Sequence, residues 1–98
     1  MGYDVLARLD NAWQARKAIE LALKEQGNYD ISVGEPEMIR GDTGTAVTIY
    51  AAKVSFKWSL NGNEKNVKAI GAYVRSPDGT RWSFVTLPLR FWNQLTGG

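Results

Sequence analysis

The dipeptide Asn61-Gly62 constrains the fold of this chain most strongly, because it separates two long segments in which apolar and polar residues alternate. Asn-Gly between such segments favours a two-residue type I′ turn, which joins two antiparallel strands. A second turn is indicated by Ser76-Pro77-Asp78-Gly79, where proline fixes φ and glycine ends the turn. The two turns predict three consecutive antiparallel strands over residues 45–60, 64–76 and 80–87.

Upstream of these strands, residues 4–26 have the pattern of an amphipathic helix. Apolar side chains recur at three-, four- and seven-residue steps, and good helix formers dominate the segment. Gly27 is expected to end the helix, since glycine readily adopts the left-handed conformation that follows a helix. The sequence therefore predicts a helix from residue 4 to residue 26. The capping-box pattern of Asn11 and Gln14 leaves open a later start at Asn11.

The remaining segments complete an α+β fold. Residues 29–40 predict a first strand that Gly34 and Pro36 interrupt, which is typical of an edge strand or a bulged strand. Residues 89–95 predict a single helical turn. We therefore expect one N-terminal helix packed on a four-stranded, twisted antiparallel sheet in meander order, with a short C-terminal helical turn. The length of 98 residues fits one domain, residues 1–98.

The two faces of the sheet follow from the register of the strands. The apolar phase changes near Ala52-Lys53, which predicts a β-bulge there. Past the bulge Ile49 would lie opposite Tyr73, and across the second turn Tyr73 would lie opposite Trp82. The face under the helix is expected to carry Val47, Ile49, Val54, Phe56, Trp58, Val67, Tyr73, Trp82 and Phe84. The opposite face is expected to carry Tyr50, Ile70, Ala72, Val74, Val85 and Leu87.

The composition excludes several classes of chemical site. The chain has no cysteine and no histidine, which excludes disulfides, thiolate zinc sites and His-dependent triads. Asp42-Thr43-Gly44 matches the triplet of aspartic proteases but lacks the apolar residues that usually precede it. The acidic residues that could ligate a cation, without the spacing of an EF-hand loop, are Asp30, Glu35, Glu37 and Asp42. We therefore predict no catalytic, metal-binding or cofactor-binding residue, and no enzymatic activity.

The hydropathy pattern predicts a cytoplasmic protein without a membrane span. The apolar runs are only a few residues long, far short of the ~20 that a spanning helix needs. The first residues, Met1 to Asp4, lack the basic and apolar regions of a secretory signal.

Several strand and turn patterns resemble those of a known superfamily. The stretch 39–48, IRGDTGTAVT, resembles the superfamily of nuclear transport factor and ketosteroid isomerase, which often places a Gly-Asp-small turn before a long strand. The turn at residues 61–62 and the segments 71–74 and 78–82 are similar to the hairpins that follow there. The resemblance covers roughly residues 13–87 and implies a cystatin-like α+β roll. The elements that close the pocket in that superfamily have no counterpart here, so no catalytic residue is carried over.

The function predicted from these features is a non-enzymatic interaction module, of the adaptor or stoichiometric-inhibitor type, that binds a protein partner. One helix can cover only one of the two apolar sheet faces, which leaves the other available. Phe91 and Trp92 either fold back over the core or anchor a partner. Members of the superfamily commonly pair through the uncovered face, which implies a homodimer. The expected partner or dimer surface comprises Tyr50, Ile70, Ala72, Val74, Val85, Leu87, Phe91 and Trp92.

Binding of single-stranded nucleic acid is the alternative function. Residues 1–44 hold five Lys/Arg against eight Asp/Glu, a balance of −3, whereas residues 45–98 hold seven against two, a balance of +5. Most of the aromatic residues also lie in the second half, and basic residues interleaved with aromatics are typical of nucleic-acid-binding surfaces. The expected contacts are Lys57, Lys68, Arg75 and Arg81.

Overall fold

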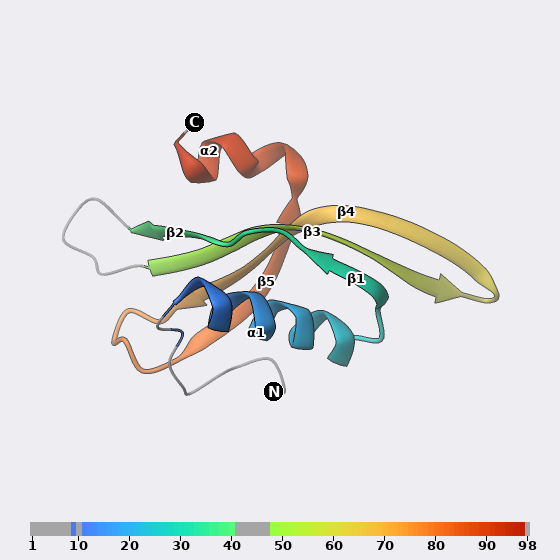
Figure 1. The fold of residues 1–98 in the computed structure, drawn as a ribbon, viewed down its shortest axis with the longest axis horizontal. Helices are drawn as coiled ribbons and strands as arrows, with labels where there is room; N and C mark the ends of the chain where they lie inside the picture. Colours follow the sequence, from blue (N-terminus) through green and yellow to red (C-terminus); the bar gives the residue numbers. More distant parts are fainter. Residues whose placement is uncertain (1–8, 10, 41–47, 98) are drawn as a thin grey trace.

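The computed structural model describes residue 9, residues 11–40 and residues 48–97, and it confirms an α+β fold (Figure 1). All strands belong to one antiparallel sheet in the order β1-β3-β4-β5, and β2 lies on the same edge of β3 as β1. The elements are α1 (Ala12–Glu25), β1 (Tyr29–Val33), β2 (Glu37–Arg40), β3 (Thr48–Leu60), β4 (Asn63–Arg75), β5 (Trp82–Pro88), the 3₁₀ helix η1 (Leu89–Phe91) and α2 (Trp92–Thr96).

The helix α1 begins later than residue 4. The side chain of Asn11 accepts a hydrogen bond of 2.9 Å from the backbone N–H of Gln14 and caps the helix, so α1 starts at Ala12. The longer helix is therefore wrong, because a capping asparagine fixes its own backbone in an extended conformation, here at φ −154°. At the other end Gly27 has φ 93°, which confirms it as the residue that ends the helix.

The long hairpin of β3 and β4 is regular, and the predicted bulge is wrong. Its pairing runs without interruption from Leu60 opposite Asn63 to Ile49 opposite Val74. Ala51 and Ala52 point to opposite faces of the sheet and both are buried. Apolar residues cover the sheet on both sides here, so the alternation of apolar and polar residues disappears without any change of register.

The register between β4 and β5 differs by two residues from the predicted one. Tyr73 lies opposite Phe84, and Arg75 lies opposite Trp82. The backbone N–H of Ser76 donates a 2.8 Å hydrogen bond to the carbonyl of Arg81, so the connection is longer than a two-residue turn. Because side chains alternate with a period of two, the shift leaves each side chain of β5 on its predicted face.

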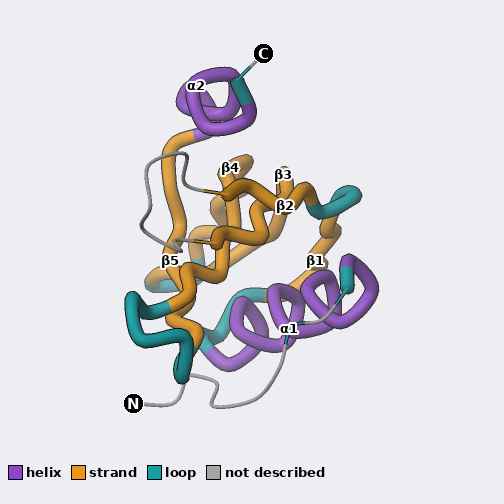
Figure 2. Tube along the Cα trace, turned by 90° about the vertical axis from the view of Figure 1, so that its left-hand side faces the viewer, coloured by secondary structure: helices purple, strands orange, loops and turns teal. Residues whose placement is uncertain are grey.

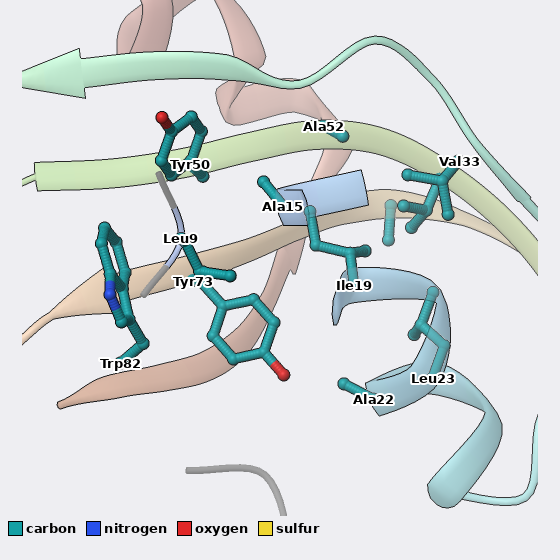
Figure 3. Close-up of a cluster of buried hydrophobic side chains, with 12 residues drawn as sticks. Leu9, Ala15, Ile19, Ala22, Leu23, Val33, Tyr50, Ala52, Tyr73 and Trp82 are labelled. Carbon is teal, nitrogen blue, oxygen red and sulfur yellow. The ribbon is translucent and has the colours of Figure 1, made fainter. Parts of the chain in front are cut away.

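The helix α1 packs on one face of the sheet, which we call the α1 face (Figure 3). Two aromatic pairs lie in this layer: the ring centroids of Tyr50 and Trp82 are 5.8 Å apart, and those of Tyr73 and Phe84 are 5.2 Å apart. The buried residues of the layer are Leu9, Ala15, Ile19, Ala22, Leu23, Val33, Tyr50, Ala52, Val54, Ala69, Tyr73 and Trp82.

The C-terminal segment, η1 and α2, packs on the opposite face, which we call the α2 face. Figure 2 shows α1 and α2 on opposite sides of the sheet. Ala51, Ile70 and Ala72 are fully buried on this face. The residues packed around them are Ile39, Ile49, Leu87, Leu89, Phe91, Trp92 and Leu95. Ile49 lies on the α2 face and Tyr50 on the α1 face, the reverse of the prediction, because both predicted positions depended on the bulge.

Candidate interaction surfaces

The C-terminal segment occupies much of the sheet face that was predicted to bind a partner. Ile70 and Ala72 lie beneath it, and Tyr50 is only 6% exposed on the opposite face. The prediction that Tyr50, Ile70 and Ala72 form a binding surface is therefore wrong, because all three are buried in the core. The members of the predicted surface that keep some exposure are Val74, Val85, Leu87, Phe91 and Trp92.

The basic residues predicted to contact nucleic acid do not form one cluster. Lys57 and Lys68 lie near each other on the α2 face of the hairpin, since their cross-strand partners are Asn66 and Ser55. Arg75 lies seven positions after Lys68 in β4, a distance of about 24 Å at the rise of an antiparallel strand. There the guanidinium of Arg75 donates to the carbonyl of Gly79 at 3.3 and 3.2 Å, and Arg81 follows the same turn.

Lys53 completes a basic cluster that sequence reasoning missed. It lies on the α2 face with Lys57 and Lys68, and we call these three residues the basic cluster. The Nζ atom of Lys53 is 5.3 Å from the centroid of the Trp92 ring. The predicted bulge concealed this arrangement, because Lys53 lay within the bulge at Ala52-Lys53 and was therefore assigned to neither face. Lys57 also forms ion pairs with Asp30 at 3.5 Å and Glu64 at 3.8 Å.

The distal part of the β3–β4 hairpin, residues 56–67, extends past the end of α1 in Figure 1, and we call it the arm. Its α1 face bears an open hollow of about 390 Å³, which we call the arm groove. Half-buried Phe56, Trp58 and Val67 line it. Leu60, on the same face near the tip, is 54% exposed. The remaining lining residues are Gln26, Asn28 and Thr86.

Polar contacts on the other side hold the arm to the rest of the sheet. The hydroxyl of Tyr29 donates a 2.6 Å hydrogen bond to Oε2 of Glu64 and is 2.8 Å from Oγ of Ser59. The hydrogen bond to the Glu64 carboxylate raises the pKa of Tyr29 above its ordinary value. These contacts connect the start of β1 to both strands of the arm, so the apolar side of the arm has a defined orientation.

A second exposed apolar feature lies on the outer surface of α1. Trp13 is 67% exposed and Leu21 is 55% exposed, and both lie on the side of the helix away from the sheet. The Nζ atom of Lys17 is 5.8 Å from the Trp13 ring centroid. The helical spacing in the sequence indicates this exposure, because Trp13 and Leu21 lie outside the apolar stripe that contains Ile19.

The described residues contain no group of three or more His, Cys, Asp or Glu side chains placed to hold a metal ion. Asp42-Thr43-Gly44 and Val47 lie outside the described residues. Within the described part of the chain, no helix is both long and apolar enough to cross a bilayer. Comparison of the chain with protein-family models, with curated proteins and with solved structures finds no match. The resemblance to the cystatin-like roll therefore stays a prediction.

Proposed function

We propose that this chain is a non-enzymatic interaction module that binds a protein partner through the arm groove. The observation that carries the proposal is the row of half-buried apolar side chains, Phe56, Trp58 and Val67, around an open hollow beyond the end of α1. Tryptophan in a partly formed pocket is the residue type that most often dominates the binding energy of protein interfaces.

The groove is held in shape before any partner arrives. Phe56 and Val67 are cross-strand partners in a regular ladder, and both also pack against the core beneath α1. Their side chains have therefore lost most of their conformational entropy on folding, and a partner that covers them loses little more. Leu60 offers further apolar surface at the tip.

Charge complementarity indicates the chemistry of the partner. Residues 53–68 carry four lysines against one acidic residue, Glu64, a balance of +3, but Lys53, Lys57 and Lys68 lie on the α2 face and Lys65 is the one beside the groove. Lys65 lies opposite Trp58 on the groove side. A segment with an apolar anchor side chain and a carboxylate that reaches Lys65 fits this groove, and the net positive charge of the arm would make its association faster at low salt.

The proposal is tested with short random peptides displayed on phage and selected on the purified protein. Enriched peptides are expected to combine an aromatic or aliphatic residue with neighbouring Asp or Glu. Calorimetry with a selected peptide should show at least tenfold weaker binding to Trp58→Ala and unchanged binding to Trp13→Ala, the matched variant on the outer surface of α1. Peptides that bind Trp58→Ala normally but lose binding to Trp13→Ala would place the site on α1 and overturn the proposal.

A specific observation favours one second candidate, binding of a single-stranded nucleic acid at the basic cluster. Lys53, Lys57 and Lys68 lie on one face, and Lys53 is next to the Trp92 ring, on which a base could stack. Titration of tryptophan fluorescence with an oligonucleotide should then give a log–log salt slope of about −2 for three phosphate contacts. Fluorescence that does not change at low salt would exclude this candidate.

A further inference from the structure

The two edges of the sheet differ in how they are protected against pairing with another strand. The β1/β2 edge consists of two short strands, separated by Gly34, Glu35 and Pro36 and shifted in register within β1. Interruptions, proline and charged side chains are the features by which proteins block an edge. The β5 edge is blocked by proline at its last residue alone, Pro88, and the side chains of residues 82–87, WSFVTL, are all uncharged.

The hydrogen-bonding groups that β5 presents outward follow from the ladder. Ser76 donates to the carbonyl of Arg81 directly opposite, so this is a hydrogen-bonded pair. Hydrogen-bonded pairs recur every second residue in an antiparallel ladder. The backbone groups of residues 81, 83, 85 and 87 therefore point toward β4, and those of Trp82, Phe84 and Thr86 point away from it.

The hydrogen bond from Gly34 N–H to the carbonyl of Lys53 supports this phase independently. It shows that the backbone N–H and C=O groups of odd-numbered residues in this part of β3 point toward β1. The backbone groups of Ala52 therefore point toward β4. Ala52 is opposite Gly71, whose groups then point to β3 and not to β5. In the described part of the chain, β5 pairs with β4 alone.

We propose that β5 pairs with β5 of a second copy of this chain, antiparallel and about a two-fold axis at Phe84. This register places Trp82 opposite Thr86 of the second copy and Phe84 opposite Phe84 of the second copy. In this register Trp82, Phe84 and Thr86 all form hydrogen-bonded pairs with the second copy. A register shifted by two residues leaves one of the three without a hydrogen-bonded pair. The two-fold contact is isologous, the commonest arrangement of homodimers.

The side chains brought together by this pairing are compatible. Ser83 lies opposite Val85 of the second copy on the α2 face, and Val85, now 38% exposed, becomes covered. Arg81 lies opposite Leu87 of the second copy, so the register places no like charges opposite each other. Thr86 belongs both to the lining of the arm groove and to this interface, so the second copy would border one edge of the groove.

The proposal is tested by light scattering over a dilution series of the purified full chain. The wild-type mass should rise from the 10.9 kDa of one chain toward twice that mass as the concentration increases. Thr86→Pro removes an outward N–H and is expected to weaken the dimer at least tenfold. Thr86→Ala is the matched control: it also removes the threonine side chain but keeps the backbone N–H, so it should dimerise like the wild type. A wild-type mass of 10.9 kDa at every concentration would overturn the proposal.

A thiol experiment tests the register without relying on the folding of the proline variant. The chain has no cysteine, so Ser83→Cys and Val85→Cys each carry one thiol. Under mild oxidation, mixing the two variants should give mainly the mixed dimer, because residue 83 lies opposite residue 85 of the second copy. Efficient cross-linking of Ser83→Cys with itself, without the mixed product, would contradict the proposed register.

Discussion

Ile19 of α1 and Gly71 of β4 are in contact so close that a Cβ atom at position 71 would lie 3.0 Å from Cγ2 of Ile19. The same Cβ would lie 3.2 Å from Cγ1 of Val54 and 3.4 Å from Cε1 of Phe84. The missing side chain therefore lets α1 approach the sheet, and Phe84 covers the glycine from the next strand. This contact sets the spacing between the helix and the sheet.

We expect Gly71→Ala to destabilise the fold by about 1–3 kcal/mol, because the added methyl overpacks the contact with Ile19. Chemical denaturation measures the free energy of unfolding. The penalty should shrink when Ile19→Ala is combined with it, since the second change removes the Cγ2 atom that clashes. A gain in stability from Gly71→Ala alone would show that the helix can move away freely.

Two tryptophans of the α1 face should differ in their contribution to stability. Trp82 is buried against Tyr50, so Trp82→Ala is expected to lower the free energy of unfolding by about 3–5 kcal/mol. Trp58 is half-exposed in the arm groove, so Trp58→Ala should cost clearly less. Thermal unfolding of the two variants decides this, and equal losses would mean that Trp58 belongs to the core.

The turn before β5 should make stability depend on pH in an acidic range. Oδ1 of Asp78 accepts hydrogen bonds from Ser76 Oγ (2.6 Å), Thr80 Oγ1 (2.7 Å) and Thr80 N–H (3.0 Å). These bonds, that of Ser76 first, lower the pKa of Asp78 from 3.8 to about 2. A lowered folded-state pKa stabilises the fold above pH 3.8, and this contribution is lost as the pH falls toward 2.

Asp78→Asn should therefore be less stable than the wild type at neutral pH and should lose stability less steeply between pH 4 and pH 2. Denaturation at several pH values measures both slopes. Parallel curves for the two proteins would contradict the role of the carboxylate.

The C-terminal segment should be needed to keep the sheet face covered. A chain that ends at Pro88 would expose Ile70, Ala72 and Leu87. We therefore expect it to bind a fluorescent dye that recognises apolar surfaces, and to aggregate as its concentration rises. A chain that ends at Thr96 is the matched control and should behave like the wild type. Dye fluorescence and light scattering distinguish the two, and equal dye binding would contradict the prediction.

The turns determined how much of the fold could be predicted from the sequence. Asn61 and Gly62 have φ angles of 51° and 80°, as the type I′ turn requires, and the hairpin register near them is confirmed. The facing of Phe56, Trp58 and Val67 followed correctly from that register. Close to a turn, alternation and turn geometry specify the same pairing, and the sequence is then sufficient.

Farther from the turns, the alternation of apolar and polar residues no longer specifies the strand pairing. Two adjacent buried alanines, Ala51 and Ala52, gave an apolar run that resembles a bulge. The connection between β4 and β5 is closed by the Asp78 side chain as well as by the backbone, and the sequence pattern did not indicate its length. The fold-back of Phe91 and Trp92, one of the two alternatives that the sequence left open, is confirmed, but the sheet face that they cover is set by long-range contacts.

The length of the arm also determines how fast its backbone amides exchange with solvent. Tyr29 opposite Lys57 is the last pair between β1 and β3, so from Trp58 to Lys65 the described strands pair only with each other. A two-stranded ribbon is marginally stable, and its amides open locally at a fraction of the global unfolding energy. Exchange should thus be fastest at the tip and slow progressively toward Gly71. Trp58 is the groove residue that lies in this two-stranded part, whereas Phe56 and Val67 lie below it against the core, so a bound partner should slow exchange at Trp58 more than at Phe56 or Val67.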